Sequence, residues 1–162
     1  LISATTAALK QCLERLSQNR REEGAKLAAM VSDRGERIRA LLFSLRQQLP
    51  ALQQAHREKL LARMASLELT ADAKRLEEEI VYVLQRADVE EEMDRLEAHL
   101  DAIKTALTGK VPCGRKLDFL MQELNREANT LASKSTALDT TNTAIEFKVL
   151  IEQMREQIQN IE

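Results

Sequence analysis

Residues Gly114 to Lys134 read G-R-K-L-D-F-L-M-Q-E-L-N-R-E-A-N-T-L-A-S-K, and this stretch decides the fold. Apolar side chains recur in it every three or four residues. They fall on one side of a helix, in which successive residues turn by about 100°. They are Leu117, Leu120, Leu124, Ala128 and Leu131. Leu and Ala are also good helix formers, so period and intrinsic propensity agree on an amphipathic helix.

The opposite side of this helix is unusual. A solvated face would carry mostly Lys and Glu, whereas this one carries short hydrogen-bonding side chains beside carboxylates. It comprises Phe119, Gln122, Glu123, Arg126, Asn129, Thr130, Ser133 and Lys134, with Glu127 one turn after Glu123. Asn, Thr and Ser have low helix propensity, so selection for helicity alone would not favour them. Two interpretations stay open: a site for a polar ligand, or a subunit interface in which these groups satisfy one another.

The composition of the whole chain indicates an all-α protein. Of its 162 residues 31% are charged and 2% aromatic, with only four Gly and two Pro as helix breakers. The net charge of −2 does not mark a nucleic-acid binder, so any basic surface must be local. Cys12 and Cys113 show no metal-type spacing and read as incidental thiols in a reducing compartment. With no apolar run of membrane length and no signal peptide, we expect a soluble, cytoplasmic protein.

The N-terminal part predicts an elongated arm or a coiled-coil-like hairpin over residues 1–69. We expect short helices at about 2–16 and 50–67, with a break or kink at Leu49-Pro50. Between them an apolar seam has a period near 3.5 residues, typical of helix pairing. It consists of Leu27, Val31, Ile38, Leu41, Leu45 and Leu49, with Arg34 at one position. Because this seam looks too long for one arm to cover, we expect at least a homodimer.

The remainder, residues 70–162, predicts an antiparallel helical bundle. We expect helices from Asp72 to Arg86, from Asp88 to the turn at residues 108–114, over the quoted stretch, and from about Ala144 to Ile161. The helix after Asp88 shows an apolar stripe of Val89, Met93, Leu96, Leu100, Ile103 and Leu107. With the arm, this amounts to six or seven helices.

Three of the bundle helices carry a polar row that combines carboxylates with an Arg. The rows are Asp88/Glu92/Arg95/His99, Glu123/Arg126/Glu127 and Glu152/Arg155/Glu156. Singly, each is explained by Glu and Arg pairs that stabilise an exposed helix. Together they supply enough ligands for a divalent metal between helices. Periodicity does not tell whether the rows converge, so a metal-assisted hydrolase and a helical interaction module remain comparable.

Four segments, in this order, resemble the C-terminal part of the bacterial, stress-induced YicC-like family. They are R-R-E-E-G-A-K-L at 20–27, A-D-V-E-E-E-M-D-R-L-E-A-H-L at 87–100, the quoted stretch at 114–134, and I-E-Q-M-R-E-Q-I-Q-N-I-E at 151–162. The resemblance implies an endoribonuclease that acts on RNA with a divalent metal, in a ring-like homo-oligomer, commonly a hexamer. It also implies a further N-terminal domain, absent from this sequence, which fits the missing initiator Met.

For such a hydrolase, the chemistry of the side chains suggests roles. Glu123 and Glu127 are the leading metal ligands for Mn²⁺ or Mg²⁺, with Glu91 and Glu92 as candidates to complete the shell. His99, with Glu123 and Glu127, is a candidate to act in catalysis. Arg95, Arg126 and Lys134 are expected to hold phosphate, and Gln122, Asn129 and Ser133 to orient sugar or base edges. The competing explanation is a buried ion-pair network of Glu123, Arg126 and Glu127 that only stabilises the bundle.

Overall fold

The computed structural model describes residues 2–66, 81, 88–109, 111–135 and 140–159. Within these residues it has four helices and no strand, which confirms the all-α fold. The helices are α1 (Ile2–Ser66), α3 (Glu90–Thr108), α4 (Gly114–Ser135) and α5 (Thr141–Gln159). No helix in the described part is both long and apolar enough to span a membrane.

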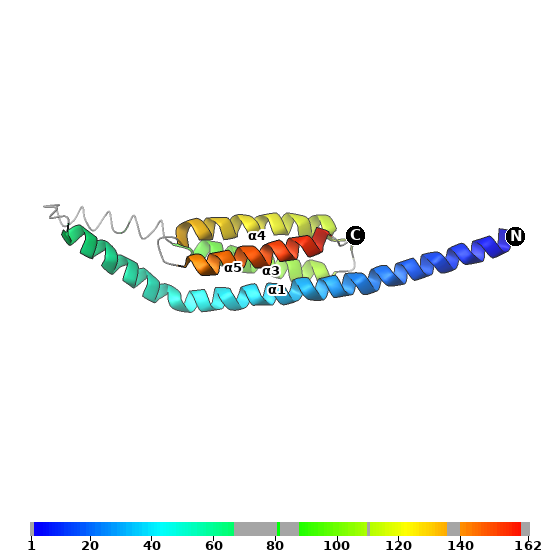
Figure 1. Cartoon of the computed structure of the whole chain (residues 1–162), viewed down its shortest axis with the longest axis horizontal. Coiled ribbons are helices and arrows are strands. Elements are labelled where there is room, and N and C mark those ends of the chain that lie inside the picture. Colours follow the sequence, from blue (N-terminus) through cyan, green and yellow to red (C-terminus); the bar gives the residue numbers. More distant parts are fainter. Residues whose placement is uncertain (1, 67–80, 82–87, 110, 136–139, 160–162) are drawn as a thin grey trace.

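Helix α1 is continuous over 65 residues, so the expectation of separate helices over residues 2–67 was wrong. Ser17 and Asn19 form helices poorly, but local propensity is weak and this run contains neither Gly nor Pro. Pro50 lies inside the helix. A proline there removes one backbone hydrogen bond and bends a helix rather than always ending it. Accordingly, α1 bends where its colour passes from cyan to green, the stretch that contains Pro50 (Figure 1).

The middle of α1 joins α3, α4 and α5 in a four-helix bundle (Figure 1). Each helix packs mainly on two others: α4 packs on α3 and α5, and α1 packs on α5 and α3. The largest fully buried side chains include Ile38 from α1, Met93 and Leu96 from α3, and Phe147 from α5. The turn at 108–114 joins α3 to α4 as antiparallel neighbours, as predicted.

From Val31 onward, the apolar seam of α1 is covered within the chain. Val31, Ile38, Leu45 and Leu49 are buried against the bundle, and Leu42 replaces the half-buried Leu41 at the inner position. Arg34, the polar residue in the seam, donates from Nε to Oε1 of Gln153 on α5 at 3.1 Å. The argument that this seam needs a second copy of the chain was therefore wrong.

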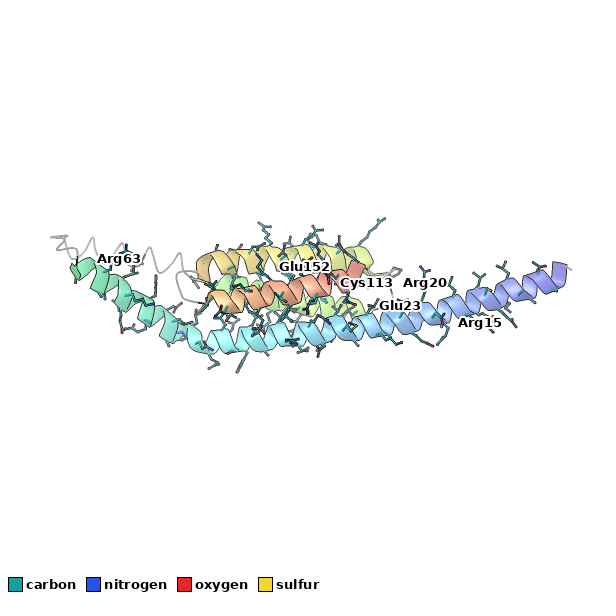
Figure 2. The ribbon with its side chains drawn as sticks, viewed as in Figure 1. Arg15, Arg20, Glu23, Arg63, Cys113 and Glu152 are labelled. Atoms are coloured by element: carbon teal, nitrogen blue, oxygen red, sulfur yellow. The ribbon has the colours of Figure 1, made fainter. Side chains whose placement is uncertain are left out.

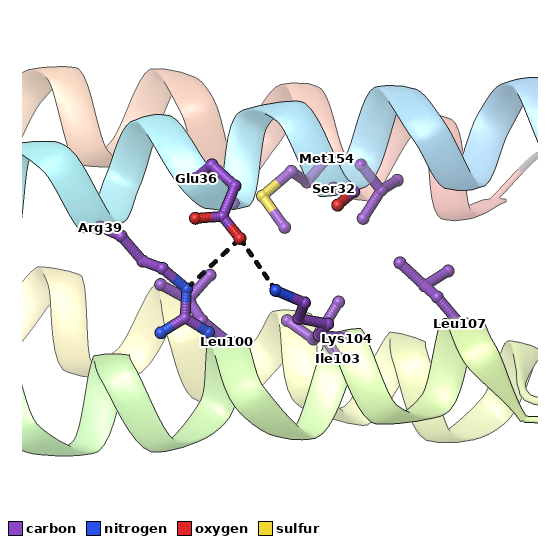
Figure 3. A pocket seen from close by; sticks show the side chains of 10 residues that line it. Ser32, Glu36, Arg39, Leu100, Ile103, Lys104, Leu107 and Met154 are labelled. Carbon is purple, nitrogen blue, oxygen red and sulfur yellow. Dashed lines mark hydrogen bonds and ion pairs between the residues drawn. The ribbon is translucent and has the colours of Figure 1, made fainter.

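Ion pairs along the rim fix α1 against α3. Arg39 binds Asp101 and Arg46 binds Asp94, each with an N–O distance of 2.7 Å. The hydrogen bond to Asp94 is the main cause that raises the pKa of the Arg46 guanidinium above its ordinary value. Glu36 lies between Arg39 and Lys104, at 3.9 and 3.4 Å (Figure 3). All these pairs are at least partly exposed, so each adds little stability and mainly sets orientation.

The expected apolar faces of the bundle helices are confirmed. On α3, Val89, Met93, Leu96, Leu100 and Ile103 are buried, and Leu107 is half-buried; on α4, all five apolar residues of the quoted stretch are buried. Helix α5 begins at Thr141, three residues before the expected start. The boundary at residue 69 lies outside the described residues. So does the helix expected over 72–86, apart from Val81, which is helical.

The first part of α1 extends beyond the bundle as an arm, residues 4–30 (Figure 1). In this arm only Gly24, Leu27 and Ala28 are even half-buried. Three of its leucines are mostly in solvent: Leu9 is 60% exposed, Leu13 58% and Leu16 53%. The arm thus leaves an apolar stripe in water, whereas the next five turns of the same helix bury theirs.

Candidate functional site

The polar face of α4 divides into two neighbouring stripes. Glu123, Glu127 and Lys134 are half-buried or buried and lie toward α3, where they meet side chains of that helix. Residues one position earlier turn toward solvent, because each residue of a helix is rotated by about 100° from the last. These exposed residues are Gln122, Arg126 and Ser133; Asn129, one turn before Ser133, is exposed on the same side. The inner stripe can build an enclosed site, and the outer stripe can only contact something outside the chain.

Three of the predicted site residues converge between α3 and α4. His99 on α3 and Glu123 and Glu127 on α4 each present one ligand atom, and these atoms lie within 4.8 Å of one another. His99 reaches them because it is one turn beyond Arg95 on the rim of the apolar stripe of α3. His99 and Glu123 are half-buried and Glu127 is buried. We call these three residues the His99 cluster.

Among the described residues, buried Glu127 has only a loosely held cationic partner. The residue is 4% exposed, and its ion pair is with Nη1 of Arg95 at 3.5 Å, the limit of a hydrogen bond. Arg95 binds Glu91 more closely, from Nη2 to Oε1 at 2.6 Å. Glu91 first, and then Glu127, raise the pKa of the Arg95 guanidinium above its ordinary value. A buried carboxylate needs close partners, so Glu127 has capacity for a further cation.

Glu92 lies in the same helix interface but is fully paired. It is also 4% exposed, and both of its carboxylate oxygens accept hydrogen bonds from Nζ of Lys134, each at 2.9 Å. This pair ties the first turn of α3 to the last turn of α4. Glu91 and Glu92, expected to complete a metal shell, are therefore engaged with Arg95 and Lys134. Lys134, expected to hold phosphate, is engaged as well.

The expected network of Glu123, Arg126 and Glu127 does not form. Arg126 is exposed and makes no ion pair with the described residues; the cation on Glu127 is Arg95 instead. On the same outer stripe, Gln122 donates to Asp118 at 3.3 Å, and Ser133 donates to the backbone oxygen of Thr130 at 2.8 Å. These are contacts within one helix, so the exposed side chains can exchange them for a ligand.

The third polar row, on α5, stays apart from the His99 cluster. Glu152 binds Arg155 of the same helix at 3.3 Å, and both are exposed. The rows on α3 and α4 thus meet, and the row on α5 is a surface feature.

The donor set of the His99 cluster fits a divalent cation. Two carboxylates and one imidazole suit Mn²⁺ or a similar first-row ion, and carboxylates alone suit Mg²⁺. Three ligands leave coordination positions for water or phosphate oxygens, as in catalytic rather than structural sites. The buried, under-compensated charge of Glu127 is the observation that favours a cation here.

Sequence reasoning missed the structural role of the Glu92–Lys134 pair. The two residues are 42 positions apart on different helices, so no local spacing joins them. Burial was the available signal. Glu92 precedes Met93 on the apolar stripe by one position, and a charge so close to a core position needs a partner from the neighbouring helix.

Comparison with known proteins gives a family match and relatives that agree with it. Residues 45–162 match the family model described as endoribonuclease YicC-like, C-terminal. A protein of Haemophilus influenzae named probable endoribonuclease YicC is 50% identical over 143 residues, 88% of this chain and 50% of its own length. One of the same name from Clostridioides difficile is 34% identical over 165 residues, 100% of this chain and 56% of its own length. The chain thus spans about half the length of these relatives.

Proposed function

The chain belongs to the YicC-like endoribonuclease family, and from this premise we propose that it forms part of a metal-dependent endoribonuclease, a hydrolase of RNA phosphodiester bonds. The single observation that carries the proposal is the His99 cluster, in which one imidazole and two carboxylates lie together and one of the carboxylates, Glu127, is buried. Metal dependence and the RNA substrate are both parts of the proposal.

In this proposal His99, Glu123 and Glu127 hold a divalent cation, Mn²⁺ or Mg²⁺. A metal bound by carboxylates supplies an activated water and neutralises charge on phosphate oxygens. The chain's own contribution is to hold the ligands on two rigid helices. The Glu92–Lys134 pair clamps these helices together about two turns from His99 on α3. Such fixed placement favours charge stabilisation during the reaction without reorganisation.

The phosphate contacts in this proposal come from arginines beside the cluster. The Arg95 side chain is 51% exposed and lies 3.5 Å from Glu127, so it can reach both the site and solvent. Arg126 is exposed one position before Glu127. A guanidinium can bind a phosphate through two parallel hydrogen bonds. Gln122, Asn129 and Ser133 extend this exposed stripe along α4 and are our candidates for sugar or base edges.

The decisive experiment is cleavage of an end-labelled hairpin RNA by the 162-residue chain, with Mn²⁺, Mg²⁺ or EDTA. A longer protein, which also contains the part that the relatives have and this chain does not cover, is tested in parallel. We expect cleavage with metal and none with EDTA. Cleavage that persists in EDTA would contradict the metal mechanism. Intact RNA with both forms, despite binding, would favour a non-catalytic role.

The second candidate function is that of a helical interaction module. The observation that favours it is the arm, whose leucines are exposed by more than half. Under this alternative, substitutions on the exposed faces change assembly or partner capture and affect no reaction. The two functions can coexist, because the arm and the His99 cluster lie in different parts of the chain.

A further inference from the structure

Phe119 is an aromatic side chain in solvent on the outer side of α4, where it is 58% exposed. Helix α4 lies across the bundle from α1, and its side chains project on the side away from α1 (Figure 2). A single exposed apolar residue is common on protein surfaces and by itself indicates no function. The side chains around Phe119 are therefore the evidence to consider.

Phe119 lies one turn before Glu123 of the His99 cluster. Residues four apart on a helix share a side, with about 5–6 Å between their Cβ atoms. Because α3 and α4 are antiparallel, the part of α3 that follows His99 runs beside Phe119. Three and seven residues after His99, on the same side of α3, it carries Ala102 and Ala106, whose side chains are too short to cover an aromatic ring. The ring is thus open to solvent beside the cluster.

Three exposed cationic side chains of α4 lie near Phe119, two of them one turn before it and the third two turns after it. They are Arg115, Lys116 and Arg126. None of them forms an ion pair within the part of the chain that the structure describes. The adjacent acid, Asp118, accepts a hydrogen bond from Gln122 at 3.3 Å. In a chain with a net charge of −2, these cations are a local basic surface on which a phosphate can bind.

Phe43 on α1 is the same residue type in a different charge environment. It is 67% exposed, and an arginine lies one turn away on each side of it. Both arginines are bound to α3: Arg39 to Asp101 and Arg46 to Asp94, each at 2.7 Å. The aromatic position on α4 thus differs from Phe43 in its unpaired cations and in the neighbouring cluster, and not in its exposure.

We propose that Phe119 is a stacking platform for one unpaired RNA base, next to the phosphodiester bond that the His99 cluster cleaves. Lys116 and Arg126 hold backbone phosphates on the two sides of the ring. An aromatic ring stacks with any base, so the platform accepts every sequence. A base within a duplex is already stacked and paired, and is not available to the ring. The substrate is therefore RNA with an unpaired nucleotide at the cleavage site. The cleavage site rests on the proposed function, whereas the stacking contact needs no metal.

The first test detects the stacking contact in EDTA, without cleavage. The chain contains no tryptophan, so Phe119→Trp places a single indole at the platform, and Phe43→Trp is the matched control. Each variant is titrated with a short single-stranded oligouridylate, and anisotropy of the labelled RNA measures binding. We expect the RNA to quench the emission of Phe119→Trp and to leave that of Phe43→Trp unchanged, because a stacked base quenches an indole. Binding without quenching of Phe119→Trp would overturn the proposal.

The second test separates the aromatic ring from apolar bulk. Phe119→Leu removes the ring and keeps an apolar side chain, so it should weaken binding of the oligouridylate by roughly tenfold. Phe119→Tyr and the control Phe43→Leu should bind as the unchanged chain does. If Phe119→Leu also binds as tightly, the proposal is wrong. If it binds RNA as tightly but has a lower mass in sedimentation, the ring packs against a protein instead.

Cleavage assays distinguish this inference from the proposed function. For a hairpin RNA with an unpaired loop, Phe119→Leu should raise KM by roughly tenfold and change kcat little, since stacking contributes uniform binding. Quenching by RNA that the chain and the longer protein never cleave would support the platform and contradict the nuclease. Equal metal-dependent cleavage of paired and unpaired RNA would overturn the platform and leave the nuclease intact. RNA that does not bind the chain would overturn both.

Discussion

Two positions about two turns apart along α4, in the α3–α4 interface, treat a buried carboxylate differently. Glu92 and Glu127 are equally buried, at 4% exposed. Glu92 receives two hydrogen bonds of 2.9 Å from Lys134, whereas Glu127 receives one of 3.5 Å from an arginine that is closer to Glu91. Burial alone therefore does not mark a functional acid. The difference lies in how closely a cationic side chain pairs with the carboxylate. Glu92, closely paired, holds two helices together, whereas Glu127, loosely paired, can still bind a ligand.

The largest effect is expected at the clamp. Lys134→Met leaves Glu92 buried without its partner, and breaking such a pair destabilises by about 3 kcal/mol. The free energy of unfolding from urea titrations measures this. Glu92→Leu combined with Lys134→Met should recover much of the loss, because well-packed apolar residues can replace a buried pair. If Lys134→Met is as stable as the unchanged chain, the distinction between the Glu92 and Glu127 positions is wrong.

The next effect is on activity at the His99 cluster. Glu127→Gln and Glu123→Gln keep shape and remove charge, so each should lower the rate of metal-dependent RNA cleavage by at least ~100-fold. Folding should stay intact. For Glu127→Gln the stability should be equal or higher, since an under-compensated buried charge is removed.

Glu146→Gln, a change of the same kind at an exposed position of α5, is the matched control and should leave the rate unaffected. If both site variants cleave RNA normally, or if they unfold, then Glu123 and Glu127 are not the functional acids.

A third measurement uses metal as a stabilising ligand. At Mn²⁺ tenfold above its dissociation constant, binding to the folded state should add about 1.4 kcal/mol and raise the melting temperature. His99→Ala and Glu127→Gln should abolish this rise. Lys134→Met lowers the starting stability but should keep it, because Lys134 belongs to the clamp. A rise that survives His99→Ala would place the metal elsewhere.

The smallest effect is expected for Arg95→Ala. Arg95 is half in solvent and holds Glu127 weakly, so its loss should change the melting temperature less than Lys134→Met does. Without a competing cation, Glu127 should bind Mn²⁺ more tightly in a titration monitored by calorimetry. RNA affinity should fall at the same time if Arg95 contacts phosphate. Weaker Mn²⁺ binding would mean that Arg95 supports the cluster instead of competing with it.

Sequence periodicity predicted which faces of α3, α4 and α5 are buried, because a helical repeat converts spacing directly into direction. It did not predict that α1 stays whole through Pro50, because a proline can bend a helix without ending it. It also misassigned the partner of the Val31–Leu49 seam. An apolar seam shows which face of a helix is packed. It does not show which helix packs there, because that depends on how distant segments of the chain fold back.

The candidate site could also be predicted in part: the sequence indicated its residues and not how each of them is paired. Side-chain chemistry and the family resemblance singled out His99, Glu123 and Glu127, which the fold brings together. They gave no basis for separating Glu92 from Glu127, because both occupy equivalent rim positions of their helices. The difference comes from one lysine on a neighbouring helix, at a distance that only the three-dimensional arrangement sets.

Because α1 is unbroken, it fixes the angle about its axis between the leucines of the arm and the bundle. Inserting one residue between Leu16 and Val31 would lengthen the helix by about 1.5 Å and turn the leucine stripe by about 100° around the axis relative to the His99 cluster. Inserting seven would turn it by only about 20°. Insertions or deletions in this stretch should therefore be tolerated in steps of seven residues, because the length of α1 sets both the distance and the direction of the leucines relative to the bundle.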